Sequence, residues 1–184
     1  MRRIPVFATL IVLAAVAVMI AMGFWQLRRL HEKEALLAHY AAAQKNPAPV
    51  EWTSRGVGKD LLYRRAHLVC AGVGDRSSIA GSNAKGEPGV AQTAECTLPG
   101  GGRALVVMGW SLQPNAGAWQ GGDVTGMIAP GPRLVAMPAV GGLEENAIPD
   151  PADLPNNHLS YAGQWFFFAA TALVIYFLAL RKRK

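Results

Sequence analysis

Charged residues are absent from two long stretches of the 184-residue sequence. Residues 4–25 and 161–180 contain no Asp, Glu, Lys or Arg. At about 1.5 Å of rise per residue, a helix of either length crosses the roughly 30 Å hydrocarbon core of a membrane. The sequence therefore predicts two transmembrane helices, with room for one small domain between them.

Common catalytic and cofactor motifs are also lacking. The chain has no Gly-rich phosphate loop of the usual pattern, no His-Glu-x-x-His and no Cys-x-x-Cys-His for covalent heme attachment. No serine lies in a nucleophile-elbow pattern, and the sequence identifies no carboxylate partner for His67. A membrane-anchored enzyme is therefore disfavoured, and no catalytic residue is predicted.

Lys and Arg are missing between Arg133 and Arg181, whereas the last four residues are all basic. The positive-inside rule then places the C-terminus in the cytoplasm, and two crossings place the N-terminus there as well. Six of the eighteen basic residues flank the spans, so the formal charge of +6 indicates anionic lipid rather than nucleic acid as their partner. These six are Arg2, Arg3, Arg181, Lys182, Arg183 and Lys184.

The first apolar stretch has a second interpretation as a cleaved signal peptide. Ala15-Val16-Ala17 offers a small-x-small cleavage site, but the apolar run continues for eight residues beyond it, which a signal peptide does not need. We therefore expect residues 1–25 to form the first transmembrane helix.

An amphipathic helical extension is predicted for residues 26–46. No Gly or Pro interrupts it before the run Asn46-Pro47-Ala48-Pro49, and apolar residues recur at helical spacing at Leu27, Leu30, Leu37 and Ala41. The predicted topology puts Arg28, Arg29 and Lys33 on the outer side, against the usual bias. Glu32, one helical turn from Arg28, and Glu34 offset this charge in part, and an anionic ligand is a second way to offset it.

Residues 47–154 are rich in Gly and Pro and contain short apolar runs. Five candidate strands, separated by turn signals, are 62–70, 90–98, 104–110, 124–128 and 134–137. This pattern predicts a small, mainly antiparallel β-barrel or sandwich outside the membrane. The acidic, Pro-containing stretch 141–153 is predicted to return the chain to the second span, within residues 155–184.

Only two cysteines occur, Cys70 and Cys96, and both lie in the predicted outer domain. In an oxidising compartment they can pair, and strand alternation allows both side chains to face the core. A structural disulfide is expected. Buried free thiols are the alternative, and a metal site lacks further ligands.

Several segments resemble the Surfeit locus protein 1 family of cytochrome c oxidase assembly factors. Their order and membrane placement match over nearly the whole chain. The segments are Gly23-Phe24-Trp25-Gln26-Leu27-Arg28-Arg29, Tyr63-Arg64-Arg65, Gly109-Trp110, Val124-Thr125-Gly126 and Asn156-Asn157-His158-Leu159-Ser160-Tyr161-Ala162-Gly163-Gln164-Trp165-Phe166.

The resemblance implies an inner-membrane protein, bacterial or mitochondrial, that assists the insertion of heme a into oxidase subunit I. Other oxidase subunits and assembly factors are further partners that it implies. One segment departs from the family pattern, because the usual Asn-Arg-Gly-Trp is replaced by Val107-Met108-Gly109-Trp110. A role carried by that Arg is therefore in doubt in this chain.

His158 is the candidate ligand of heme iron. If Asn156 or Asn157 caps the second helix, His158, Tyr161 and Trp165 fall on one helical face, where imidazole can bind iron and the aromatic rings can contact the macrocycle. Arg28 and Arg29, beside Trp25 and Gln26, are expected to hold the propionates. Two alternatives remain: an interfacial anchor belt of Trp, Tyr and His, and a scaffold or accessory oxidase subunit that never touches heme.

Overall fold

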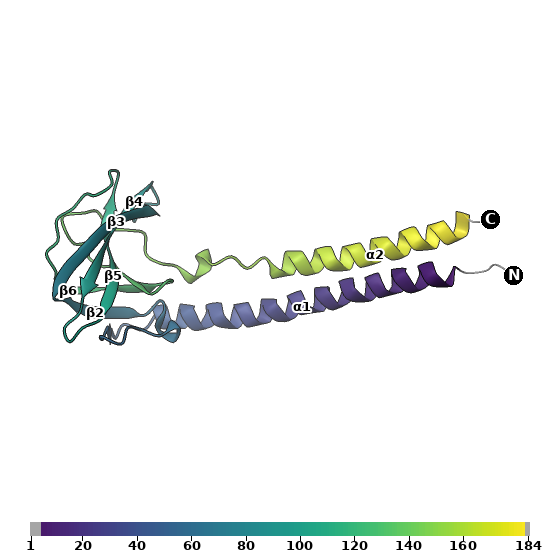
Figure 1. The fold of residues 1–184 in the computed structure, drawn as a ribbon, viewed down its shortest axis with the longest axis horizontal. Helices are drawn as coiled ribbons and strands as arrows, with labels where there is room; N and C mark the ends of the chain where they lie inside the picture. The colour runs from purple at the N-terminus through teal and green to yellow at the C-terminus, as the bar shows by residue number, and fades with distance from the viewer. Residues whose placement is uncertain (1–4, 183–184) are drawn as a thin grey trace. The chain divides into compact units, whose positions relative to one another are not determined.

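A computed structural model of the chain describes residues 5–182, which form two separate units (Figure 1). One unit combines the residues up to Leu36 with those from Pro155 onward, and the other comprises Leu37–Leu154. Arg2, Arg3, Arg183 and Lys184, on which part of the topology prediction rests, lie outside the described residues.

Two long helices include residues 6–25 and 161–180 of the uncharged stretches. Helix α1 spans Val6–Gln44 and helix α2 spans His158–Lys182. Both are long and apolar enough to cross a membrane, which supports membrane association. Large apolar side chains such as Phe7 and Phe167 are exposed along them, as expected of surfaces that face lipid. The α1 helix continues through the predicted extension and ends just before Asn46-Pro47, where Pro disfavours helical backbone.

Small side chains allow α1 and α2 to pack closely and antiparallel. Gly23 is buried, and a Cβ atom at this position would come within 2.6 Å of the Phe166 ring. The hydroxyl groups of Thr9 and Tyr176 are hydrogen-bonded near the other end of the pair. Close backbone approach through small residues and interhelical hydrogen bonds are the usual means of helix association in membranes. Buried or partly buried positions of α2 recur at steps of four and three residues, at His158, Ala162, Trp165, Ala169, Ala172 and Tyr176.

The second unit contains one seven-stranded sheet in the order β1-β2-β6-β7-β5-β4-β3. The strands are β1 (Val50–Glu51), β2 (Arg65–Cys70), β3 (Gly72–Ser82), β4 (Pro88–Thr97), β5 (Arg103–Ser111), β6 (Gly122–Ala129) and β7 (Arg133–Ala136). Two short 3-10 helices, η1 (Lys59–Leu61) and η2 (Pro151–Asp153), lie in its connections.

The prediction of a closed barrel or a sandwich is wrong, because the strands form a single open sheet. Its terminal strands β1 and β3 each pair with one neighbour and not with each other. The sheet is also mixed, since β1 pairs with β2 and β5 pairs with β7 in parallel, whereas the other four pairings are antiparallel. Strand β7 forms a hairpin with β6 and lies between β6 and β5. Strands joined only by successive hairpins would not produce this order.

Strand β3 was not predicted from the sequence. It carries Gly, Ser, Asp and Arg, and most of its side chains are exposed, so it lacks the apolar alternation that identifies a half-buried strand. Strand β2 begins at Arg65 rather than at residue 62, because Tyr63 has a φ of 63°, outside the β region.

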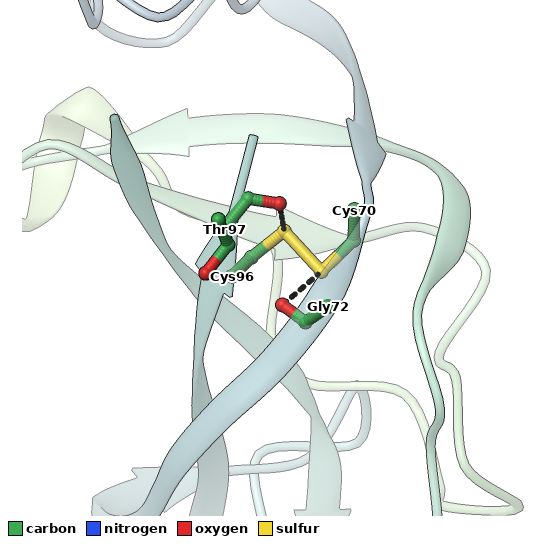
Figure 2. The surroundings of a disulfide bond; sticks show 4 residues. All are labelled: Cys70, Gly72, Cys96 and Thr97. Atoms are coloured by element: carbon green, nitrogen blue, oxygen red, sulfur yellow. Dashed lines mark hydrogen bonds between the residues drawn. A yellow bond between two sulfur atoms is a disulfide. The ribbon is translucent and has the colours of Figure 1, made fainter. Parts of the chain in front are cut away.

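A disulfide joins Cys70 at the end of β2 to Cys96 in β4 (Figure 2), the pair that the sequence predicts. The two Cα atoms are 5.4 Å apart, and both side chains are buried in the main core. The bond links strands that are not neighbours in the sheet. It therefore adds a connection across the core that main-chain hydrogen bonds do not supply.

Loss of this disulfide should destabilise the sheet domain. For the double variant Cys70→Ser/Cys96→Ser we expect the free energy of unfolding to fall by about 3 kcal/mol, because a loop of this length no longer restricts the unfolded chain. Denaturant titration of the full chain in detergent measures this change. Equal stability of variant and wild type, or alkylation of both thiols in freshly isolated membranes, would contradict the assignment.

His67 lies between two carboxylates from neighbouring strands. Its Nδ1 is 2.9 Å from Oε2 of Glu51 in β1, and its Nε2 is 3.1 Å from Oδ1 of Asp123 in β6. Sequence reasoning found no partner for His67, because these contacts arise from the parallel β1–β2 pairing and the β2–β6 register. The hydrogen bond with Glu51, followed by that with Asp123, raises the pKa of His67 above 6.5 despite partial desolvation.

The raised pKa of His67 implies a specific pH dependence of stability. Because the imidazolium is favoured in the folded state, its stabilising contribution is complete below about pH 6.5 and is lost as the pH rises through the raised pKa. We expect His67→Gln to flatten the stability profile above pH 6.5, measured by urea unfolding at constant ionic strength. His31→Gln, at an exposed histidine of α1, is the control. The effect is small because both carboxylates are exposed, and an unchanged profile would contradict the ion-pair role.

Candidate functional site

The candidate site lies where α2 begins. Asn157 occupies the cap position, and its carbonyl oxygen accepts a hydrogen bond from the Tyr161 N–H at 3.1 Å. The Asn156 side-chain oxygen is buried and has no hydrogen-bond partner within residues 5–182. These residues place His158 on the first turn of the helix, on the side that contacts α1.

A hydrogen bond from α1 orients the His158 imidazole. Its Nδ1 lies 2.7 Å from Oε1 of Gln26, and the pair is partly buried. Because a carbonyl oxygen only accepts, Nδ1 carries the hydrogen, and in the neutral imidazole Nε2 then keeps its lone pair. No hydrogen bond to Nε2 occurs among the described residues, so this nitrogen is available as a ligand. A histidine that ligates a metal commonly has its other nitrogen held in this way.

A hollow lies beside His158 and is lined otherwise by one face of α1. The lining residues of α1 are Arg29, Glu32, Lys33 and Leu36, and the volume is about 310 Å³. Their spacing of three and four residues brings these side chains to the same side of the helix. All of them belong to the same unit as His158.

The hollow carries an excess of positive charge. Arg29 donates to Oε2 of Glu32 at 2.6 Å, and both side chains are about half exposed. Lys33 is partly buried and makes no ion pair within the part of the chain that the structure describes. One imidazole nitrogen beside two cations and one carboxylate can therefore receive a ligand that combines a metal centre with anionic groups.

Only some of the predicted site residues lie in or beside the hollow. It places His158 and Arg29 in the hollow and joins Gln26 to His158. The other four predicted residues do not line the hollow: Trp25, Arg28 and Tyr161 are exposed, and Trp165 is partly buried.

Sequence reasoning missed Glu32, Lys33 and Leu36 as lining residues. The sequence placed Lys33 in a basic cluster and Glu32 among the acidic residues that offset its charge. It also paired Glu32 with Arg28, whereas the structure pairs Glu32 with Arg29. The helical spacing of residues 29, 32, 33 and 36 was a signal that could have grouped them.

Two apolar helices, one before and one after a small sheet domain in the sequence, are typical of a membrane-associated protein. A sequence model of the SURF1 family matches residues 13–170, and the chain belongs to this family. The family is linked to cytochrome c oxidase assembly, and its members are assembly factors rather than enzymes. No curated protein matches the chain.

Proposed function

We propose that this protein binds heme a at His158 and assists its delivery to subunit I of cytochrome c oxidase. The observation that carries the proposal is the Gln26–His158 hydrogen bond, which leaves Nε2 available beside a hollow lined by Arg29 and Lys33. Membership of a family linked to oxidase assembly supports the choice of partner.

The chemistry of the hollow fits heme in each of its parts. Heme presents an iron that binds imidazole, an apolar macrocycle and two anionic propionates. Nε2 of His158 would ligate the iron, and Arg29 and Lys33 would hold the propionates. Leu36 supplies an apolar contact for the macrocycle, whereas Tyr161, half exposed one helical turn from His158, does not line the hollow. Heme is the cargo, and no chemical step on it is required.

Gln26 acts as a positioning residue in this proposal. It touches the imidazole, not the cargo, and it selects the tautomer in which Nε2 can ligate. Loss of such a partner commonly weakens metal binding about 10–100-fold.

A scaffold or accessory oxidase subunit that does not bind heme is the second candidate. It is favoured by Trp25 and Tyr161, which are exposed to 43% and 50% and do not line the hollow. Exposed aromatic side chains at the ends of membrane spans are typical of an interfacial anchor belt. The two candidates differ in whether the isolated protein carries heme.

Heme binding is tested with protein isolated from cells that make heme a. We expect His158→Ala to lower bound heme at least tenfold and Gln26→Leu to weaken heme binding about tenfold, as for other positioning residues. Arg29→Gln/Lys33→Gln should weaken heme retention and reduce its salt dependence, because fewer charge contacts remain to be screened. Absorption spectra and heme-to-protein ratios report each change.

Matched variants test whether the changes in heme binding arise merely from the loss of any positive charge or any histidine. His31→Ala and Arg28→Gln alter exposed residues of α1 outside the hollow and should leave the spectrum unchanged. If His158→Ala retains heme a with an unaltered spectrum, ligation by His158 is wrong. If wild-type protein from these cells carries no heme, the scaffold candidate replaces the proposal.

The proposed location is the bacterial inner membrane, or the mitochondrial one in a eukaryote, with both termini inside and residues 26–160 outside. The uncharged spans and the basic residues at the end of α2 support it. A reporter active only in the periplasm should give no signal when fused after Lys184 and a signal when inserted between Lys85 and Gly86. The reverse pair of results would contradict this topology.

A further inference from the structure

The sheet has a second apolar face that the heme proposal does not use. Val107 in β5, Ala129 in β6 and Val135 in β7 form a separate buried cluster with Ala91 in β4. In each of β5, β6 and β7, the adjacent residues belong to the main core, so alternation places this cluster on the opposite face. Central strands of this sheet are thus apolar on both sides.

A pocket of about 290 Å³ lies over this second cluster. The short side chains of Ala91 and Ala129 form part of its floor, and the end of β3 and segment 146–150 form its walls. Ile79 and Ile148, two of the lining residues, are 38% and 50% exposed. Protein interiors are close-packed, so an open apolar pocket over a sheet is suited to receive an apolar group from another molecule.

Asn146 provides a polar group inside this pocket. The residue is 8% exposed, and neither Oδ1 nor Nδ2 of its side chain has a hydrogen-bond partner within residues 5–182. Leaving both atoms buried and unpaired is costly, which makes a ligand that satisfies them favourable. A carboxamide offers one donor and one acceptor side by side, as a peptide group requires.

Two acidic residues on the pocket wall favour a ligand with a positive charge. Asp150 and Asp153 line the pocket, with Arg133 as a lining cation. Burial raises the pKa of the Tyr63 hydroxyl, Tyr40, Asp153 and Asp150 raise it further, and Arg133 opposes this rise. The two carboxylates are exposed, so they would favour a Lys or Arg side chain at the solvent-facing wall of the pocket.

The pocket opens beside an edge strand, which indicates the form of the ligand. Strand β3 is at the end of the sheet, and Ala147 N–H donates to the Ser82 carbonyl at 2.9 Å. Segment 145–147 therefore already pairs with the end of β3 and the residues after it, where an isolated bridge joins Asn83 to Asn146. An extended peptide can continue this ladder along the preceding residues of β3 while its alternate side chains point to the pocket face.

We infer that this pocket binds an extended peptide segment of a partner protein. One aliphatic side chain packs on Ala91 and Ala129, a peptide group pairs with the Asn146 carboxamide, and a neighbouring basic side chain faces Asp150 and Asp153. The site lies wholly within Leu37–Leu154, so it requires neither His158 nor heme.

The experiment selects ligands from a display library of random octapeptides against the full chain in lipid nanodiscs, without heme. Ala129→Leu, which fills the floor of the pocket, serves for counter-selection. We expect the enriched peptides to share an aliphatic residue followed within two positions by Lys or Arg. Synthetic peptides of this type should bind at least tenfold more weakly to Ala129→Leu and to Asn146→Leu.

Charge variants keep the test valid if the pocket substitutions disturb folding. Asp150→Asn/Asp153→Asn changes two exposed residues and should weaken binding at least fivefold and reduce its salt dependence. Glu144→Gln/Glu145→Gln removes the same charge from exposed residues that do not line the pocket and should have little effect.

Three outcomes would overturn the inference. The first is a library that shows no enrichment over Ala129→Leu, and the second is a set of enriched peptides without the aliphatic-basic pattern. The third is native mass spectrometry in which the wild type, but not Ala129→Leu, retains a lipid acyl chain, which would make lipid the occupant. None of these outcomes bears on heme binding at His158.

Discussion

The antiparallel packing of α1 and α2 is the constraint on which the candidate site depends. Gln26 and His158 are 132 residues apart in the chain, and only the pairing of the two helices brings their side chains together. Gly23 permits this approach, because any larger residue would collide with the Phe166 ring. Small residues buried along the helix pair thus allow Gln26 to reach the His158 imidazole, where its carbonyl oxygen orients the ring.

The sheet domain combines a large core with a second, smaller apolar face. The main core includes the Cys70–Cys96 disulfide and most inward-facing residues of the central strands. Met108 is 1% exposed in this core, at the position where the family pattern has Arg. A cationic surface role is therefore absent at this position in this chain, because its side chain packs among apolar residues. The opposite face keeps a polar, unpaired Asn146 beside alanines, which is unusual in a surface without a partner.

The helices and the cysteine pair could be read from the sequence because they follow from local properties. Uninterrupted apolar stretches define α1 and α2, and strand alternation places Cys70 and Cys96 toward the core. Strand β3 could not be predicted because an edge strand needs little apolar surface. The open, mixed sheet could not be predicted because it depends on which strands pair across long separations in the sequence. The same limit applies to the candidate site. His158 and Arg29 could be proposed from the sequence, whereas the Gln26 contact, the Arg29–Glu32 pair and the carboxylates at His67 required the tertiary structure.

The neutrality of Gln26 has a consequence for any ligand that His158 binds. A carboxylate at this position would draw the Nδ1 hydrogen toward itself and make Nε2 a stronger electron donor, whereas an amide orients the ring without a negative charge. A resident metal group benefits from the stronger donor, because it must remain bound throughout turnover. The proposed transfer of a cargo would need the opposite balance, in which the bond forms in a defined geometry and can still be exchanged for a ligand of the recipient.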